Sequence, residues 1–245
     1  MEPRKRHESG PSSPGATAQE FENFIYLVSH DVRSSVRALL ELPQWIEEDL
    51  REAGIRIDGS LKENLALMNT HMRRLDRMLI DLLIYSRIGR MQSDDDVPWD
   101  EAIESVLDHL RMPPGLRLIR DIGARSIRIG RNDAVTLVSS LLSNAIKHHD
   151  RDKGTIRLST REEDGCICLE IADDGPGIPP DSRARVFEVM TTLKPRDQVE
   201  GSGMGLANVR KIATHYGGRI EWVDPEAERG CHLVLRFPKA APPLH

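Results

Sequence analysis

The sequence predicts an α + α/β protein, in which an antiparallel helical hairpin that dimerises into a four-helix bundle precedes an α/β sandwich domain. Two long stretches in the first 90 residues carry apolar side chains at three- and four-residue spacing, which is typical of amphipathic helices. After residue 98 the pattern changes to short alternating stretches, typical of strands, between shorter helical ones. Helices grouped with a mixed sheet indicate a sandwich, and 245 residues give room for one or two domains.

The N-terminal region divides into a tail and a hairpin. Residues 1–18 mix charged residues with Pro, Ser and Gly and have no apolar period, so we predict a disordered tail. The first helix is expected to run to about Glu52 with a bend at Pro43, and the second helix to begin near Ser60. The second helix repeats a bundle seam in steps of four and three, at Leu61, Leu65, Met68, Met72, Leu75, Leu79, Leu82 and Ser86. Because one hairpin cannot cover both apolar stripes, residues 19–90 predict a homodimer.

The run GRMQSDDDVP interrupts the helical period with Gly, Pro and three consecutive acids, so residues 91–98 are predicted to be a domain linker. Residues 99–240 then form the second domain. Its expected elements are a helix at 99–110, strands at 116–120 and 126–129, a helix capped by Asn132 or Asp133, strands in TIRLSTRE and CICLEIA, a helix to about Tyr216, and strands near 218–223 and 231–237.

Composition excludes several classes of protein. A formal net charge of -5 argues against nucleic acid as a partner. No apolar run approaches the roughly 18 residues of a membrane span, and the N-terminus lacks the apolar segment of a signal peptide, so we expect a cytoplasmic protein without a membrane span. Three cysteines, an odd number, argue against a disulfide framework. Cys166 and Cys168 share one face of a predicted strand, and we expect them to pack in the core.

One histidine in the first predicted helix lies off the apolar stripe. His30 follows Val28, a residue of the apolar stripe, by two positions, and two positions on a helix rotate the side chain by roughly 200°. The imidazole is therefore expected to face solvent, with Asp31 beside it. A surface histidine is the simpler interpretation of this pattern alone, so a chemical role depends on what the rest of the chain supplies.

A helix in the second half carries polar side chains away from its apolar face. In SNAIKHH, Asn144, Lys147 and His148 are predicted to lie on turns that can border a pocket. A carboxamide oxygen suits Mg²⁺, and a lysine suits a phosphate group. Helix residues that simply meet solvent are the alternative interpretation of this motif.

Two glycine-rich loops accompany this helix. DDGPGIP follows a strand directly, so Gly175 and Gly177 let the backbone approach a flat ligand, while Asp173 offers an acceptor for an amino group. GSGMGL at 201–206 opens a helix, where glycines before helical N–H groups can hold a phosphate. Each loop alone is compatible with an ordinary turn.

The order and separation of these motifs resemble the ATP-binding domain of sensor histidine kinases, which has the Bergerat-type fold. LLSNAIKHH is similar to the asparagine box, DDGPGI to the first glycine box, VFEVM to the phenylalanine box and GSGMGLANVRKI to the second glycine box. SHDVRSSVRAL is similar to the phosphoacceptor box of the dimerisation domain. The resemblance covers nearly everything from Phe21 to Phe237, and TLKPRDQVEGSGMGL and HHDR are most similar to the phytochrome-type kinase branch.

This resemblance implies an ATP-dependent autokinase that phosphorylates its own His30, with Asp31 as orienter and base, and passes the phosphoryl group to an aspartate of a response regulator receiver domain. ATP and Mg²⁺ are the implied cofactors, Asn144 is the implied metal ligand, and residues 180–200 are the implied nucleotide lid. No sensory domain precedes Phe21 in this sequence, so we expect either that such a domain has been removed or that the signal comes from a separate sensory protein or domain. The implied nucleotide-binding residues are Asn144, Lys147, His148, Asp173, Gly175, Gly177, Gly201, Gly203, Gly205 and Leu206.

Two departures from the family pattern limit what the resemblance implies. The family often has Thr or Asn followed by Pro where this chain has Ser34 and Ser35, so a phosphatase reaction is not implied. The phenylalanine box has Phe187 without a second aromatic residue, and Met190 stands nearby. Two other hypotheses remain: a phosphotransfer or scaffold dimer with a vestigial ATP domain, which would not bind ATP, and an ATPase that performs conformational work, which would release phosphate without forming a phosphoprotein.

Overall fold

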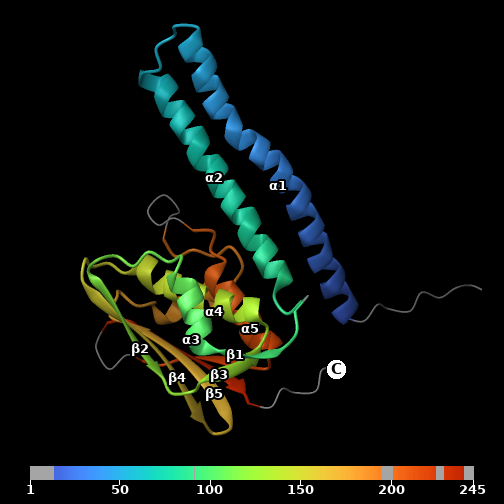
Figure 1. Ribbon diagram of the computed structural model, residues 1–245, viewed down its shortest axis with the longest axis vertical. Helices are drawn as coiled ribbons and strands as arrows, with labels where there is room; N and C mark the ends of the chain where they lie inside the picture. The colour runs from blue at the N-terminus through green and yellow to red at the C-terminus, as the bar shows by residue number, and fades with distance from the viewer. Residues whose placement is uncertain (1–13, 91, 195–200, 225–228, 240–245) are drawn as a thin grey trace, which may run out of the picture. The chain divides into compact units, whose positions relative to one another are not determined.

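The chain divides into two compact units, residues 1–86 and 87–245. The computed structural model describes residues 14–90, 92–194, 201–224 and 229–239, with side chains described from Asp31 onward. The first unit is a pair of long helices, and the second is a sheet with helices on one side (Figure 1). The boundary falls at the C-terminal end of the second helix, before the predicted linker.

The first unit consists of α1 (Pro14–Glu52) and α2 (Gly59–Arg87), which form the predicted hairpin. α1 begins at Pro14, inside the predicted tail, because the fixed φ of proline suits the first turn of a helix. The rest of that tail, residues 1–13, lies outside the described residues. α1 runs to Glu52, as predicted, with Pro43 inside the helix.

The hairpin turn is set by a Schellman motif at the end of α1. Ile55 N–H donates to the Leu50 carbonyl at 2.8 Å, and Gly54 N–H donates to the Arg51 carbonyl at 3.0 Å. Gly54 has φ 68°, a left-handed conformation that glycine adopts without strain. These bonds satisfy carbonyls that the helix end would otherwise leave unpaired, and they fix where α1 stops.

The predicted apolar stripes are only partly covered within the hairpin. Val36, Leu65 and Leu79 are buried, and Leu83 is buried in place of the predicted Leu82, which is half-buried. Other members of the same stripes keep 38–40 % of their surface exposed, namely Val32, Leu39, Ile46, Met68 and Leu75. Part of each apolar stripe is therefore buried between the two helices, and the other part remains exposed.

The second unit is built on a five-stranded sheet of order β2-β4-β5-β7-β6. β2 pairs with β4 in parallel, and the remaining neighbours are antiparallel. α3, α4 and α5 lie on the same side of this sheet (Figure 1). The bounds are α3 Trp99–Leu107, β2 Leu116–Ile122, β3 Ser126–Ile129, α4 Arg131–His148, β4 Gly154–Glu163, β5 Cys166–Asp173, the short helices η1 Pro180–Ser182 and η2 Arg185–Phe187, α5 Gly205–His215, β6 Arg219–Trp222 and β7 Cys231–Pro238.

Strand alternation separates a core face of the sheet from an outer face. The register aligns Leu158, Ile171 and Leu233 on the core face, and all three are buried against the helices. The prediction that both cysteines are buried is confirmed for Cys168, which is 0 % exposed, whereas Cys166 is half-buried. Cys168 lies on the outer face, where it aligns with Arg236 and the guanidinium Nη1 lies 3.3 Å from the sulfur.

The predicted linker is part of the second unit rather than a free connection. Asp95–Pro98 forms β1, which pairs with β3 in a two-stranded antiparallel sheet. Ile88 is 3 % exposed and belongs to the core of this unit. The three acids and the proline predicted a linker, but β3 provides this segment with backbone hydrogen-bond partners that its own sequence does not indicate.

The buried Asp133 carboxylate bonds the residues that precede β1 to the rest of the second unit. Asp133 Oδ2 accepts hydrogen bonds from the Gly89 N–H at 2.9 Å and from the Tyr216 hydroxyl at 2.7 Å. The Tyr216 oxygen in turn accepts the Gly130 N–H at 3.0 Å. The prediction that Asn132 or Asp133 caps α4 is therefore wrong, because the helix begins at Arg131 with Gly130 as its N-cap. Asp133 is instead 3 % exposed inside the unit.

Candidate functional site

The last two turns of α4 carry the polar side chains of the predicted asparagine box. Asn144 and His148 are half-buried and Lys147 is exposed. A Cβ at Gly201 would overlap the Lys147 ammonium nitrogen, so this lysine lies directly against the second glycine-rich loop. The fold thereby brings together two motifs that are more than 50 residues apart in the sequence.

Positive charge gathers around the end of α4. Burial lowers the pKa of His148, and the neighbouring charges of Lys147 and Lys194 lower it further. Lys194 belongs to the predicted lid, so the lid segment comes within electrostatic reach of α4. A site with two lysines and an uncharged imidazole is suited to an anionic group such as a phosphate.

Asp173 is the last residue of β5 and opens the first glycine-rich loop. Burial raises the pKa of Asp173, although its carboxylate accepts the Gly175 N–H at 3.0 Å. The loop is tightly folded: Gly177 has φ 75°, and a Cβ there would lie 2.6 Å from the Gly230 carbonyl oxygen. A buried carboxylate with a raised pKa favours a further hydrogen-bond donor, such as the amino group of a base.

The second glycine-rich loop leads into α5. Gly203 has φ 76°, and a Cβ there would lie 2.5 Å from the Thr191 carbonyl oxygen, so only glycine fits between the loop and the lid segment. The Met204 N–H donates to the Ser202 hydroxyl at 3.2 Å. Gly205 is the first residue of α5. The Leu206 side chain is 7 % exposed and packs in the core, so only its backbone is placed for a phosphate.

The lid prediction, residues 180–200, is described as far as residue 194, and residues 195–200 lie outside the described residues. Phe187 is buried, and its ring centroid lies 5.8 Å from that of Trp222. Trp222, in β6, supplies an aromatic partner from outside the phenylalanine box. Met190 follows with φ 60°, an uncommon conformation for a residue with a side chain.

The sequence reasoning missed a second set of contacts beside this site. His149 Nε2 and Asp174 Oδ1 are 2.9 Å apart, and Arg229 makes a bidentate pair with Asp150 at 2.7 and 2.8 Å. The signal was present in the sequence as HHDR after the asparagine box and as the doubled acid in DDGPGI. The third partner, Arg229, follows from the tertiary structure alone.

The predicted phosphoacceptor motif lies on α1. His30 falls within this helix, and its side chain is outside the described residues. Asp31, Ser34 and Ser35 are exposed. Their exposure agrees with the helical geometry predicted for this face.

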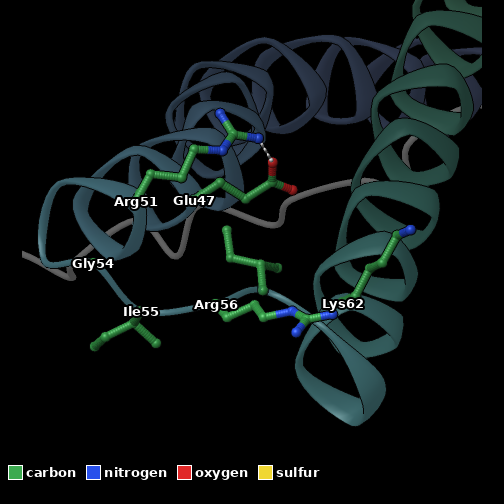
Figure 2. A pocket seen from close by; sticks show the side chains of 7 residues that line it. Glu47, Arg51, Gly54, Ile55, Arg56 and Lys62 are labelled. Atoms are coloured by element: carbon green, nitrogen blue, oxygen red, sulfur yellow. Dashed lines mark hydrogen bonds and ion pairs between the residues drawn. The ribbon is translucent and has the colours of Figure 1, made fainter.

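A pocket at the hairpin turn contains none of the predicted site residues. Figure 2 shows it between the end of α1 and the start of α2, with the Glu47 and Arg51 side chains paired at 3.2 Å along one wall. Its lining is Glu47, Arg51, Gly54, Ile55, Arg56, Ile57 and Lys62. None of the helices in the described part of the chain combines the length and the apolarity needed to cross a bilayer.

Comparison with known proteins defines the class to which this fold and site belong. The family described as histidine kinase-, DNA gyrase B-, and HSP90-like ATPase matches residues 130–241. This range contains α4, both glycine-rich loops and α5, so the motifs of the candidate site fall inside the ATPase domain.

Relatives of the whole chain are sensor kinases. It is 31 % identical over 226 residues to the methanogenesis regulatory histidine kinase FilI of Methanothrix harundinacea, covering 89 % of this chain and 25 % of the relative. It is 24 % identical over 227 residues to cyanobacterial phytochrome A of Nostoc, covering 89 % and 28 %. The crystal structure of full-length ShkA in complex with AMPPNP matches with a TM-score of 0.66 and 22 % identity, over 91 % of this chain and 47 % of that one.

Residues 130–241 therefore match the histidine kinase-, DNA gyrase B-, and HSP90-like ATPase family, and the chain is similar to sensor histidine kinases and to a phytochrome. This confirms the resemblance inferred from the sequence motifs. The chain spans only about a quarter of the length of these curated relatives.

Proposed function

We propose that this protein is an ATP-dependent histidine autokinase that phosphorylates His30 and transfers the phosphoryl group to an aspartate of a response regulator receiver domain. The observation that carries the proposal is the contact of Lys147 with Gly201, which joins the asparagine box to the second glycine-rich loop. Homology to sensor histidine kinases supports the same reaction.

Each part of the nucleotide has a corresponding group in the second unit. The Asp173 carboxylate accepts a hydrogen bond from the amino group of adenine, and Lys147 with the loop backbone at Gly203 and Gly205 contacts phosphate oxygens. A His30 ring nitrogen then attacks the γ-phosphorus, the bond to the β-phosphate oxygen breaks, and ADP leaves. Asp31 accepts the proton of the other ring nitrogen, which directs the lone pair of the attacking nitrogen towards phosphorus.

The donor set fits Mg²⁺ bound mainly by the nucleotide. Asn144 offers a carboxamide oxygen on α4, three residues before Lys147, and Mg²⁺ commonly takes few protein ligands together with phosphate oxygens and water. When bound, the metal would neutralise charge on the transferring group. The role of Asn144 is to hold it on the same helix that presents Lys147.

The hairpin fits a homodimer with a surface for a receiver domain. The exposed members of the apolar stripes, among them Leu39 and Leu75, are typical of a bundle that is completed by a second copy. Dimerisation would bury them, and the exposed motif around His30 would remain accessible to the receiver aspartate.

The test is phosphorylation of the purified protein with Mg-ATP. We expect an acid-labile, alkali-stable phosphate that His30→Gln abolishes and that Asn144→Ala prevents by loss of the metal. His71→Gln, which changes an exposed histidine elsewhere in the hairpin, is the matched control and should label normally. Labelling that persists in His30→Gln would refute the proposal, and release of free phosphate without a phosphoprotein would favour an ATPase that performs conformational work.

A further inference from the structure

A set of contacts links the end of α4 to the beginning of the first glycine-rich loop. We define the α4–β5 bridge as the His149–Asp174 and Asp150–Arg229 contacts. His149 is the C-cap of α4 and Asp174 follows the last residue of β5. The bridge therefore connects the element that carries Asn144 with the element that carries Asp173.

The inner half of the bridge is buried on the histidine side. The His149 side chain is 1 % exposed, and its Nε2 donates at 2.9 Å to Oδ1 of Asp174, whose side chain is 52 % exposed. The same oxygen accepts the Thr155 N–H at 2.8 Å, while the Asp174 N–H donates to the Thr155 carbonyl at 3.3 Å. The hydrogen bonds from His149 and Thr155 outweigh the effect of burial and lower the pKa of Asp174. A carboxylate that is stabilised as the anion is a stronger acceptor for the imidazole N–H.

One glycine makes room for this pair. A Cβ at Gly154 would overlap His149 Nε2 and would lie 2.6 Å from Asp174 Oδ1. On the other side of the ring, Nδ1 accepts the Arg151 N–H at 3.2 Å. The imidazole is thus held on both nitrogens, and its orientation is determined by its surroundings.

The outer half of the bridge reaches the same loop from the surface. Arg229 donates to both oxygens of Asp150 and lies 3.4 Å from the Gly175 carbonyl oxygen through its Nε. Both side chains are more than a third exposed, so solvent weakens this pair. The consecutive residues 149 and 150, which follow α4, therefore both contact one loop, and His149 is the member of the bridge whose side chain is buried.

We propose that His149 and Asp174 are positioning residues that hold the phosphate-binding end of α4 in register with the base-binding Asp173, which deepens and rests on the proposed function. ATP spans both halves of the site, so its binding requires a fixed separation between them. Adenosine contacts only the half at Asp173. Loosening the bridge should therefore weaken ATP binding and leave adenosine binding unchanged, whereas a purely structural defect would weaken both.

The experiment measures Mg-ATP and adenosine affinity on the full chain, by calorimetry and by NMR titration. His149→Phe keeps a planar aromatic ring, somewhat larger than imidazole, and removes both nitrogens, and we expect it to raise the ATP dissociation constant about tenfold or more without affecting adenosine. His149→Gln places an amide N–H near the position of Nε2 and should restore most of the ATP affinity. His109→Phe, at an exposed histidine of the same unit, is the matched control and should bind both ligands normally.

Asp174→Leu tests the same contact from the other side and should reproduce the selective loss of ATP affinity. If His149→Phe and Asp174→Leu bind ATP like the wild type, or lose adenosine affinity in equal measure, the positioning role is refuted while the kinase assignment stands. If the wild type shows no Mg-dependent ATP affinity, the proposed function itself fails.

Discussion

The contribution of Asp133 to the stability of the second unit can be predicted from the two hydrogen bonds that its buried oxygen accepts. Asp133→Ala removes the acceptor of both Gly89 N–H and Tyr216 O–H. A hydrogen bond to a charged group contributes about 1.5–3 kcal/mol, so we expect the free energy of unfolding to fall by about 3–5 kcal/mol. Asp133→Asn can keep one oxygen at the same place and should cost only about 1 kcal/mol, through loss of charge.

Urea unfolding followed by tryptophan fluorescence can measure this effect in the intact chain. The protein has three tryptophans, and Trp45→Phe leaves Trp99 and Trp222, both in the second unit, as reporters. Tyr216→Phe combined with Asp133→Ala should cost less than the sum of the two single changes, by about 1–2 kcal/mol. A loss below about 1 kcal/mol for Asp133→Ala, or strict additivity, would refute the assignment of Asp133 as a shared acceptor.

Three further outcomes are expected. Gly203→Ala should weaken Mg-ATP binding about tenfold or more, because φ 76° disfavours a side chain and a Cβ would meet the Thr191 carbonyl oxygen. The control is Gly165→Ala, since Gly165 has φ 73° but no neighbour within 4 Å, and this variant should bind ATP normally. ATP affinity should fall as the pH is lowered and Asp173 becomes protonated. Because burial raises the pKa of Asp173, this fall should begin at a higher pH than for an ordinary aspartate. A fall that begins only at the pH of an ordinary aspartate would count against Asp173 as the adenine acceptor. Phe187→Ala should destabilise the second unit by about 3 kcal/mol and change Trp222 fluorescence, since the two rings are in contact, and an unchanged emission spectrum would exclude that contact in solution.

The order and type of the elements were determined by local sequence. The strand predicted at 126–129 is found at Ser126–Ile129, and the predicted hairpin and the helix that follows the second glycine-rich loop are also present. These predictions succeed because hydrophobic periodicity and glycine placement act within a few residues. The motifs of the candidate site were likewise recognisable from sequence, since each is a short run at fixed spacing from a helix or a strand.

The hydrogen-bond partners of the polar groups were known only from the tertiary structure. Asp133 looked like a helix cap, yet it is a buried acceptor because Gly89 and Tyr216 converge on it from positions 44 and 83 residues away. The acidic segment Asp95–Pro98 became a strand because β3 offered it partners. His149 and Asp174 join across 25 residues for the same reason. Burial and hydrogen-bond pairing depend on elements that are distant in the chain, so a local pattern can supply the side chain without identifying its partner.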